Sequence, residues 1–169
     1  DLAARMAATR VLTTGCGKGS GFYRAVDSLK QKAVLAPVKM APAEIVHLMQ
    51  EFSQRSQLFS DTGAVHAAAL ADGEIQVFRE DVARHNAIDK LVGNAILGDR
   101  DVSAMCLLTS GRISSELVLK AARLGLGLLL SRSAPTALAV ELAQELGITI
   151  VGFIRGQRCN IYCNPWRII

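Results

Sequence analysis

The sequence has few aromatic residues and no long apolar segment. Aromatic side chains make up 5% of the 169 residues, too few for the stacking platforms on which single-stranded nucleic acids bind. The longest apolar run, "LGLGLLL" after Arg123, is far shorter than the ~20 residues of a membrane-spanning helix. We therefore expect no nucleic-acid partner and no membrane partner.

A signal peptide and a disulfide framework are also missing. The chain begins "DLAARMAATR", which has no initiator methionine and no apolar signal-peptide core, so we expect a fragment or a processed product. The four cysteines, Cys16, Cys106, Cys159 and Cys163, do not have the spacing of a small disulfide-rich domain, which favours a reducing, cytoplasmic setting. Cys159 and Cys163 would share one strand face, a spacing that suits neither a zinc knuckle nor a redox pair. We interpret them as buried small hydrophobic residues.

The composition is that of one domain with a substantial core. Half of the residues are hydrophobic, the mean hydropathy is +0.28, and the mass is 18.1 kDa, which suits a single folded domain. The net charge of +4 and the pI near 9.1 mildly favour an anionic partner.

One stretch near the N-terminus, "TTGCGKGSGF" (13–22), has glycine at every second position. A phosphate-binding loop of the Walker type needs a hydroxyl residue directly after its lysine, whereas Lys18 is followed by Gly19. The alternating glycines favour a mobile segment, and Lys18 and Arg24 are cations that would lower the pKa of Cys16 and activate its thiol. The residues alone leave two interpretations open, a reactive mobile thiol and a flexible arm with an incidental cysteine.

Hydrophobic periodicity predicts an α/β domain after a mobile N-terminal arm at 1–35. A helix from Ala43 has an apolar stripe, and Asp72-Gly73 between two β-like runs predicts a hairpin. Ser133 is predicted to cap a helix with Pro135 in its first turn. Further helices are predicted around the stripes Ile88, Leu91, Val92, Ala95, Ile96 and Leu117, Val118, Ala121, Ala122, and strands at "AMCLLTS", "LGLLLS", "ITIVGFI" and "NIYC". Residues 36–169 are therefore predicted to form a three-layer α/β/α domain with a mixed sheet.

Polar residues gather at the junctions that follow predicted strands, at 79–86, 110–112, 131–136 and 153–158. Ligands of open α/β sheets bind beyond the carboxyl ends of the strands. We expect these loops to form one shared site, because helix caps and turns do not explain the arginines among them.

Five long motifs identify a family. "TGAVHAAAL", "REDVARHNAIDKLVG", "SGRISSELVLKAARLG", "SRSAPTALAVELA" and "GFIRGQRCNIYCNPWRI" resemble, in order, those of the formate dehydrogenase accessory family FdhD, over nearly all of residues 13–169. The resemblance implies a cytidine-deaminase-like fold, a homodimer and an additional N-terminal segment that this chain lacks. It also implies a sulfurtransferase-type carrier, which passes persulfide sulfur from a cysteine desulfurase to the molybdenum or tungsten bis-guanine-dinucleotide cofactor needed by the formate dehydrogenase catalytic subunit.

The resemblance also implies which residues act. Cys16 matches the first cysteine of the family's C-G-x-C-G loop and is the expected catalytic residue. Gly19 stands at the second cysteine position, which argues against a dithiol mechanism and leaves a one-cysteine persulfide relay. The guanine-dinucleotide end of the cofactor is expected to bind Phe153, Ile154, Arg155, Gly156, Gln157 and Arg158, with weaker candidates Arg112, Ser133 and Thr136 in neighbouring loops. Without the resemblance, 153–158 would be interpreted as a solvent-exposed basic turn.

Two other functions were weighed against the sulfur carrier. A zinc-dependent nucleobase deaminase needs H-x-E and P-C-x-x-C, but His66 is followed by Ala67 and the chain has no C-x-x-C. We therefore expect no metal site and a packed or hydrogen-bonded His66. A non-catalytic guanine-nucleotide or cofactor-binding chaperone module stays an alternative. Arg84 and His85 could line the cofactor site or be structural.

Overall fold

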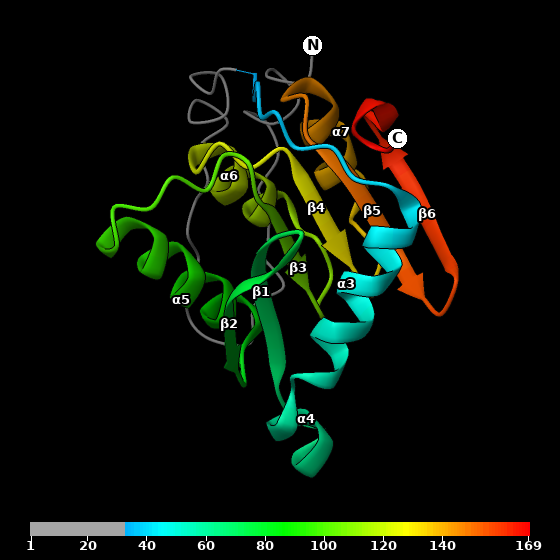
Figure 1. Cartoon of the computed structure of the whole chain (residues 1–169). Helices are drawn as coiled ribbons and strands as arrows, with labels where there is room; N and C mark the ends of the chain where they lie inside the picture. Colours follow the sequence, from blue (N-terminus) through cyan, green and yellow to red (C-terminus); the bar gives the residue numbers. More distant parts are fainter. Residues whose placement is uncertain (1–32) are drawn as a thin grey trace. The chain divides into compact units, whose positions relative to one another are not determined.

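A computed structural model describes residues 33–169 (Figure 1). The Cys16 loop and all but the last three residues of the predicted arm lie outside the described residues. The described elements, in chain order, are α3 (Pro42–Gln54), α4 (Gln57–Thr62), β1 (His66–Asp72), β2 (Glu74–Asp81), α5 (Arg84–Leu97), β3 (Cys106–Thr109), α6 (Ser115–Arg123), β4 (Leu128–Ser131), α7 (Ala137–Glu145), β5 (Thr149–Arg155), β6 (Arg158–Cys163) and the 3₁₀ turn η1 (Pro165–Arg167).

The strands form one six-stranded mixed sheet in the order β2-β1-β3-β4-β5-β6. The central strands β3, β4 and β5 are parallel and are linked through α6 and α7. The strands β1 and β6 pair antiparallel to β3 and β5, and the hairpin partner β2 lies at the edge. This arrangement confirms the predicted mixed sheet.

Helices cover both faces of the sheet. On one face, α3 packs through Ile45, Leu48, Met49 and Phe52 onto alternate residues of the strands, among them Leu108, Leu130 and Val151. On the other face lie α5, α6 and α7 (Figure 1), whose apolar stripes are buried. Because both faces are covered, the central strands are almost continuously apolar, and each fully buried leucine contributes about 1.5–3 kcal/mol. The three-layer α/β/α prediction is confirmed, and the arrangement is compatible with a cytidine-deaminase-like fold.

Local sequence signals explain where several elements begin and turn. Helix α3 starts with Pro42 in its first turn, and the Glu44 carboxylate accepts a hydrogen bond of 2.7 Å from the Ala41 amide, which satisfies one of the exposed helix-end donors. Gly73 turns the β1–β2 hairpin at φ +69°, a conformation that glycine adopts without strain. The predicted hairpin is confirmed.

Two details of the helix prediction are wrong. The cap of α7 is Thr136, whose hydroxyl accepts from the Ala139 amide at 3.2 Å, and not Ser133. The chain stays extended through Pro135, which forms a parallel bridge with Ile113, so the helix starts later than predicted. Ile96, expected on the buried stripe of α5, is 66% exposed, because the buried face runs through Ala87, Ile88, Leu91 and Ala95.

Bulges in the β5–β6 pairing separate the two C-terminal cysteines. Cys163 pairs with Ile150 while Ile161 pairs with Val151, so the register shifts by one residue between them. A bulge of this kind reverses the alternation of side chains along the strand. Cys159 packs against the core cluster on the α3 side, to which Cys163 does not belong, so the expectation of a shared face is wrong. Cys163 is buried as expected, and Cys159 is half-buried.

A buried arginine fastens the C-terminal turn to the core. Arg167 is 4% exposed, and its guanidinium donates to the carbonyls of Gly147 at 2.6 Å and Val34 at 3.1 Å. Its Nε atom is buried without a hydrogen-bond partner in the described part of the chain. Burial lowers the pKa of Arg167. The contacts tie Val34, the α7–β5 turn and η1 together.

We expect Arg167→Met to lower the free energy of unfolding by roughly 2–4 kcal/mol, because the buried carbonyls lose charge-assisted hydrogen bonds worth ~1.5–3 kcal/mol each. Urea denaturation followed by circular dichroism measures this change. Arg123→Met, at an exposed position of α6, is the matched control and should change stability by no more than about 0.5 kcal/mol. Equal stability of the two variants would contradict the anchoring role.

Candidate functional site

The polar loops meet at the carboxyl ends of the parallel strands. Ser110 and Arg132 directly follow β3 and β4, and Arg155 ends β5. Because β1 runs antiparallel to β3 with Ala68 opposite Thr109, the first residue of β1, His66, lies at the same edge. Residues from 110–112, 131–136 and 153–158 therefore line a common region, whereas 79–86 contributes no lining residue to the pockets found there.

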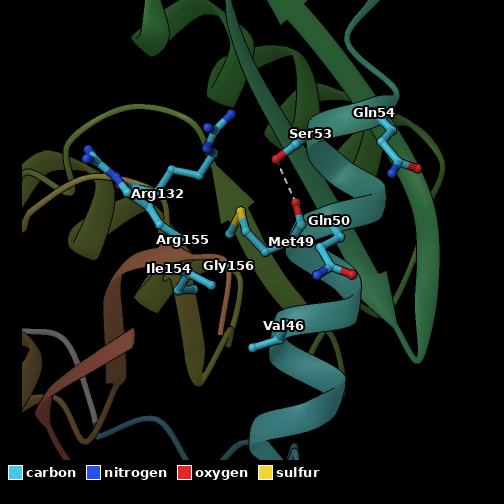
Figure 2. Close-up of a pocket in the computed structure, with 9 residues that line it drawn as sticks. All are labelled: Val46, Met49, Gln50, Ser53, Gln54, Arg132, Ile154, Arg155 and Gly156. Carbon is cyan, nitrogen blue, oxygen red and sulfur yellow. Dashed lines mark hydrogen bonds between the residues drawn. The ribbon is translucent and has the colours of Figure 1, made fainter. Parts of the chain in front are cut away.

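Residues 33–169 line two larger pockets at this edge. The "α3 pocket", of about 300 Å³, lies between α3 and the end of β5 (Figure 2). The "α4 pocket", of about 580 Å³, lies beside α4 and the start of β1. The α3 pocket is lined by Val46, Met49, Gln50, Ser53, Gln54, Arg132, Ile154, Arg155 and Gly156, and the α4 pocket by Phe59, Gly63, Ala64, Val65, His66, Ser110, Arg132, Ser133 and Arg155. Arg132 and Arg155 line both pockets.

The backbone that carries these arginines is tightly held. The Phe153 amide donates to the Ser133 carbonyl at 3.1 Å, and a Cβ on Gly152 would lie 2.9 Å from that same oxygen, so only glycine allows this approach. Phe153 itself has φ +50°, a conformation that costs a non-glycine residue of order 1–3 kcal/mol and often occurs at functional sites. The two loops are thus fixed against each other.

Among residues 33–169, no acidic side chain pairs with Arg132 or Arg155. Arg155 Nε donates to the Arg132 carbonyl at 3.3 Å, and its guanidinium lies 5.7 Å from the centre of the Phe153 ring. Within residues 33–169, neither Arg132 nor Arg155 forms an ion pair. Both side chains are exposed. Two such guanidinium groups favour an anionic ligand and suit phosphate oxygens in particular.

His66 closes one wall of the α4 pocket. Its Nδ1 lies 3.3 Å from the Ser110 hydroxyl, which also accepts from the Ala67 amide at 3.0 Å. Burial, reinforced by the charge of Arg84 and by His85, lowers the pKa of His66 below 6.5. The contact with Ser110 confirms the prediction of a packed or hydrogen-bonded histidine.

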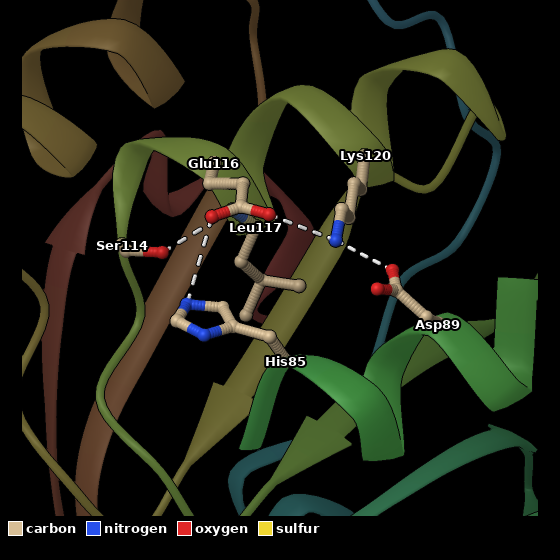
Figure 3. A network of polar contacts seen from close by, with 6 residues as sticks. All are labelled: His85, Asp89, Ser114, Glu116, Leu117 and Lys120. Atoms are coloured by element: carbon tan, nitrogen blue, oxygen red, sulfur yellow. Dashed lines mark hydrogen bonds and ion pairs between the residues drawn. The ribbon is translucent and has the colours of Figure 1, made fainter. Parts of the chain in front are cut away.

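His85 lies in a different polar network, between α5 and α6 (Figure 3). Its Nε2 is 3.6 Å from Glu116, whose carboxylate also pairs with Lys120 at 2.9 Å, and Lys120 contacts Asp89 at 2.5 Å. Burial acts to lower the pKa of Lys120, but its bonds to Asp89 and Glu116 outweigh this effect and raise it. His85 lines neither the α3 nor the α4 pocket, and the network joins the two helices, which favours its structural interpretation. Arg84 packs beside Gly111, where a Cβ would lie 3.2 Å from its side chain.

The other predicted site residues are only partly brought together. Ser133, Arg155, Ile154 and Gly156 line one or both pockets. Phe153 is 39% exposed and stacks against Arg155. Arg112, Gln157 and Arg158 are exposed outside the lining of these pockets, and the Thr136 hydroxyl caps α7.

Sequence reasoning placed the loop 131–136 at the site without singling out Arg132, and it missed the pocket wall on α3. Arg132 follows directly after the buried strand "LLLS", the same position that placed its loop at the site. Gln50 lies on the polar side of α3, and no local pattern distinguishes it from an ordinary solvent-facing residue.

The structure offers no metal centre in the part of the chain that it describes. Between residues 33 and 169, no group of at least three His, Cys, Asp or Glu side chains is arranged to hold a metal ion. Over the same residues, no helix combines the length and the apolar character needed to cross a membrane.

We expect His66 to titrate below pH 6.5. Because the folded chain then binds fewer protons at His66 than the unfolded chain, its contribution to stability is present above pH 6.5 and falls as the pH drops toward the lowered pKa. NMR of the imidazole ring protons measures the midpoint, and His66→Gln assigns the signal. A midpoint at or above 6.5 would contradict the burial of this ring.

Comparisons with known proteins agree with this fold. The model of the FdhD/NarQ family matches residues 1–169. The protein named sulfur carrier protein FdhD of Bacillus subtilis (strain 168) is 44% identical over 160 residues, 94% of this chain and 61% of that protein. Its namesake in Staphylococcus aureus (strain MRSA252) is 45% identical over 161 residues, 95% of this chain and 61% of the relative.

A solved structure is also similar. The crystal structure of a candidate formate dehydrogenase accessory protein from Desulfotalea psychrophila has a TM-score of 0.78 and 38% identity, over 85% of this chain and 62% of that chain. The present chain thus spans about three fifths of the length of the curated relatives it matches. On the family match and the identities to its relatives, the chain belongs to the FdhD/NarQ family.

Proposed function

We propose that this chain is a sulfur carrier in the maturation of formate dehydrogenase. Its membership of the family and its 44% identity to a protein named as a sulfur carrier support this role. The carrier takes persulfide sulfur from a cysteine desulfurase and passes it to a molybdenum or tungsten bis-guanine-dinucleotide cofactor, which is its substrate. Its partners are the desulfurase, the catalytic subunit of formate dehydrogenase and a second copy of the chain.

The observation that carries this proposal is the state of the other cysteines. Cys106 is fully buried, and burial raises its pKa to about 12. Burial also raises the pKa of Cys163, and Cys159 is half-buried on β6. A carrier cysteine must reach two partners and react as a thiolate. These environments disfavour Cys106 and Cys163, and Cys159 is partly covered, which supports Cys16 of the glycine-rich loop as the carrier.

The loading step needs only one cysteine. The Cys16 thiolate attacks the outer sulfur of the persulfide on the desulfurase. A sulfur–sulfur bond forms at Cys16 while the bond between the two desulfurase sulfurs breaks, and the desulfurase cysteine leaves as a thiolate. The exchange needs no external oxidant or reductant, so Gly19 at the second cysteine position is no obstacle to it.

The cofactor-binding part of the proposal is supported by the paired arginines. Arg155 offers its guanidinium at the junction of the two pockets, with Ser133 and Gly156 nearby. A diphosphate is an anion of the type that such a group binds through charge-assisted hydrogen bonds.

A second candidate function is a nucleotide-binding chaperone module without sulfur chemistry. It is favoured by the fact that residues within 33–169 line both pockets. Such a module would bind the cofactor and protect it while another protein supplies the sulfur. Sulfur loading on the chain separates the two functions.

We expect one sulfur atom to add to the protein on incubation with a cysteine desulfurase and cysteine, and none to add to Cys16→Ala. The reason is that burial raises the pKa of Cys106 and Cys163, so these thiols react slowly. Intact-mass spectrometry measures the addition, and Cys159→Ala, which should load like the wild type, is the matched control. Sulfur on Cys106, Cys159 or Cys163 in place of Cys16 would overturn the assignment.

We expect the protein to bind guanosine diphosphate and Arg155→Ala to bind it roughly tenfold or more weakly, because a charged hydrogen bond is worth ~1.5–3 kcal/mol. Calorimetry at increasing salt measures the affinity, which should fall with ionic strength. Arg158→Ala, measured in parallel, tests the sequence prediction that this exposed arginine also takes part. Wild-type affinity in both arginine variants would contradict this placement of the anion.

A further inference from the structure

Arg132 stands where the pockets of the site meet. It lines the α3 pocket, the α4 pocket and a small apolar crevice between Phe52, Phe59 and Val65. Figure 2 shows Arg132 and Arg155 together on one side of the α3 pocket, opposite helix α3. Since neither pairs with a carboxylate within residues 33–169, the two side chains form a cationic bridge between the pockets. The oxygens of a diphosphate can accept hydrogen bonds from both guanidinium groups.

The two pockets differ in chemistry. The α3 pocket has an apolar surface of Val46, Met49 and Ile154, and beside it the Gln50 side chain is exposed and makes no hydrogen bond within the described residues. An apolar surface with a free carboxamide suits a flat heterocycle, because the ring packs on the surface and the amide bonds its polar edge.

The α4 pocket is about twice as large and more polar. Ser110, Ser133 and His66 line it, and Gly63 and Ala64 line it on the α4 side. Such a wall suits a larger polar group that bears several hydrogen-bonding atoms. The two pockets therefore match the two unequal ends of a single ligand.

We propose that the site binds a diphosphate-linked ligand in a single orientation, in which Arg132 holds the diphosphate between the two pockets. The nucleobase occupies the α3 pocket against Met49 and Gln50, the diphosphate lies on Arg132 and Arg155, and the group on the other phosphate enters the α4 pocket. This inference rests on the proposed function, whose substrate carries a diphosphate between its guanosine and its metal-bearing end. It directs the metal-bearing end toward His66 and Ser110, and away from the β5–β6 turn at Gly156.

Calorimetry with two ligands tests the direction of binding. Guanosine diphosphate fills only the α3 pocket and the arginine bridge, whereas diguanosine diphosphate, two guanosines joined through a diphosphate, fills both pockets. Gln50→Ala should weaken both ligands about three- to tenfold, the loss of one hydrogen bond, and Arg132→Ala should weaken both roughly tenfold or more. Gln144→Ala, an exposed glutamine on α7, is the matched control and should bind like the wild type.

The decisive variant is Ala64→Trp, which fills the α4 pocket from an exposed position. Guanosine diphosphate should bind it like the wild type, while diguanosine diphosphate loses its additional affinity. Ala64→Phe is a smaller block to be used if the tryptophan variant unfolds by circular dichroism.

Loss of guanosine diphosphate binding in Ala64→Trp with wild-type binding in Gln50→Ala would reverse the direction and overturn the inference. Failure of the wild type to bind either ligand would also overturn it. Sulfur loading of Cys16 is measured without a nucleotide, so the carrier role would stand or fall separately.

Discussion

The parallel pairing of β3, β4 and β5 is the constraint on which the site depends. Cys106 pairs with Leu128 and Leu128 with Thr149, so the three strands start at the same level. Their carboxyl ends therefore lie together, and the residues that follow each strand are brought to one edge. Helices α6 and α7 return the chain on one face of the sheet, and α3 covers the other. Any change that broke this pairing would move Ser110, Arg132 and Arg155 apart and destroy the site.

The site combines a fixed backbone with free side-chain ends. The buried Ser131 hydroxyl donates to the Gly111 carbonyl at 2.8 Å and accepts from the Ser133 amide at 2.9 Å, which joins the loops after β3 and β4. The amide of Phe153 joins the end of β5 to the same loop. Polar groups held in place before a ligand arrives lower the entropic cost of binding. The guanidinium groups of Arg132 and Arg155 extend from this rigid frame.

The proposed chemistry divides between two parts of the chain. Residues 33–169 supply a folded core, two pockets and a cationic bridge, while their three cysteines are buried or half-buried. High burial makes Cys106 a packing residue, because ionising its thiol in the core is costly. In the proposed function, the folded core binds the anionic substrate and Cys16 carries the sulfur.

Much of the fold follows from the sequence, because burial on two faces and helical stripes leave strong patterns. The strands β1 to β6 and the helices α3, α5, α6 and α7 were predicted from periodicity, glycine and proline alone. The sequence did not reveal α4, a six-residue helix with no buried residue, since so short a polar segment has no periodicity. It placed the cap of α7 at Ser133, because the extended bridge of Ile113 with Pro135 is a long-range contact.

For the site as well, some features follow from the sequence and others only from the tertiary structure. Motifs in the sequence determined the family, the candidate cysteine and the arginine-bearing loop 153–158, because these depend on residue identity along the chain. Only the tertiary structure decided that Arg155 lies with Arg132 and Gln50, whereas Arg158 lies outside these pockets. The physical reason is that a pocket is made where separate elements meet. The pairing of strands and the packing of α3 fix that meeting point, and neither can be read from a single loop.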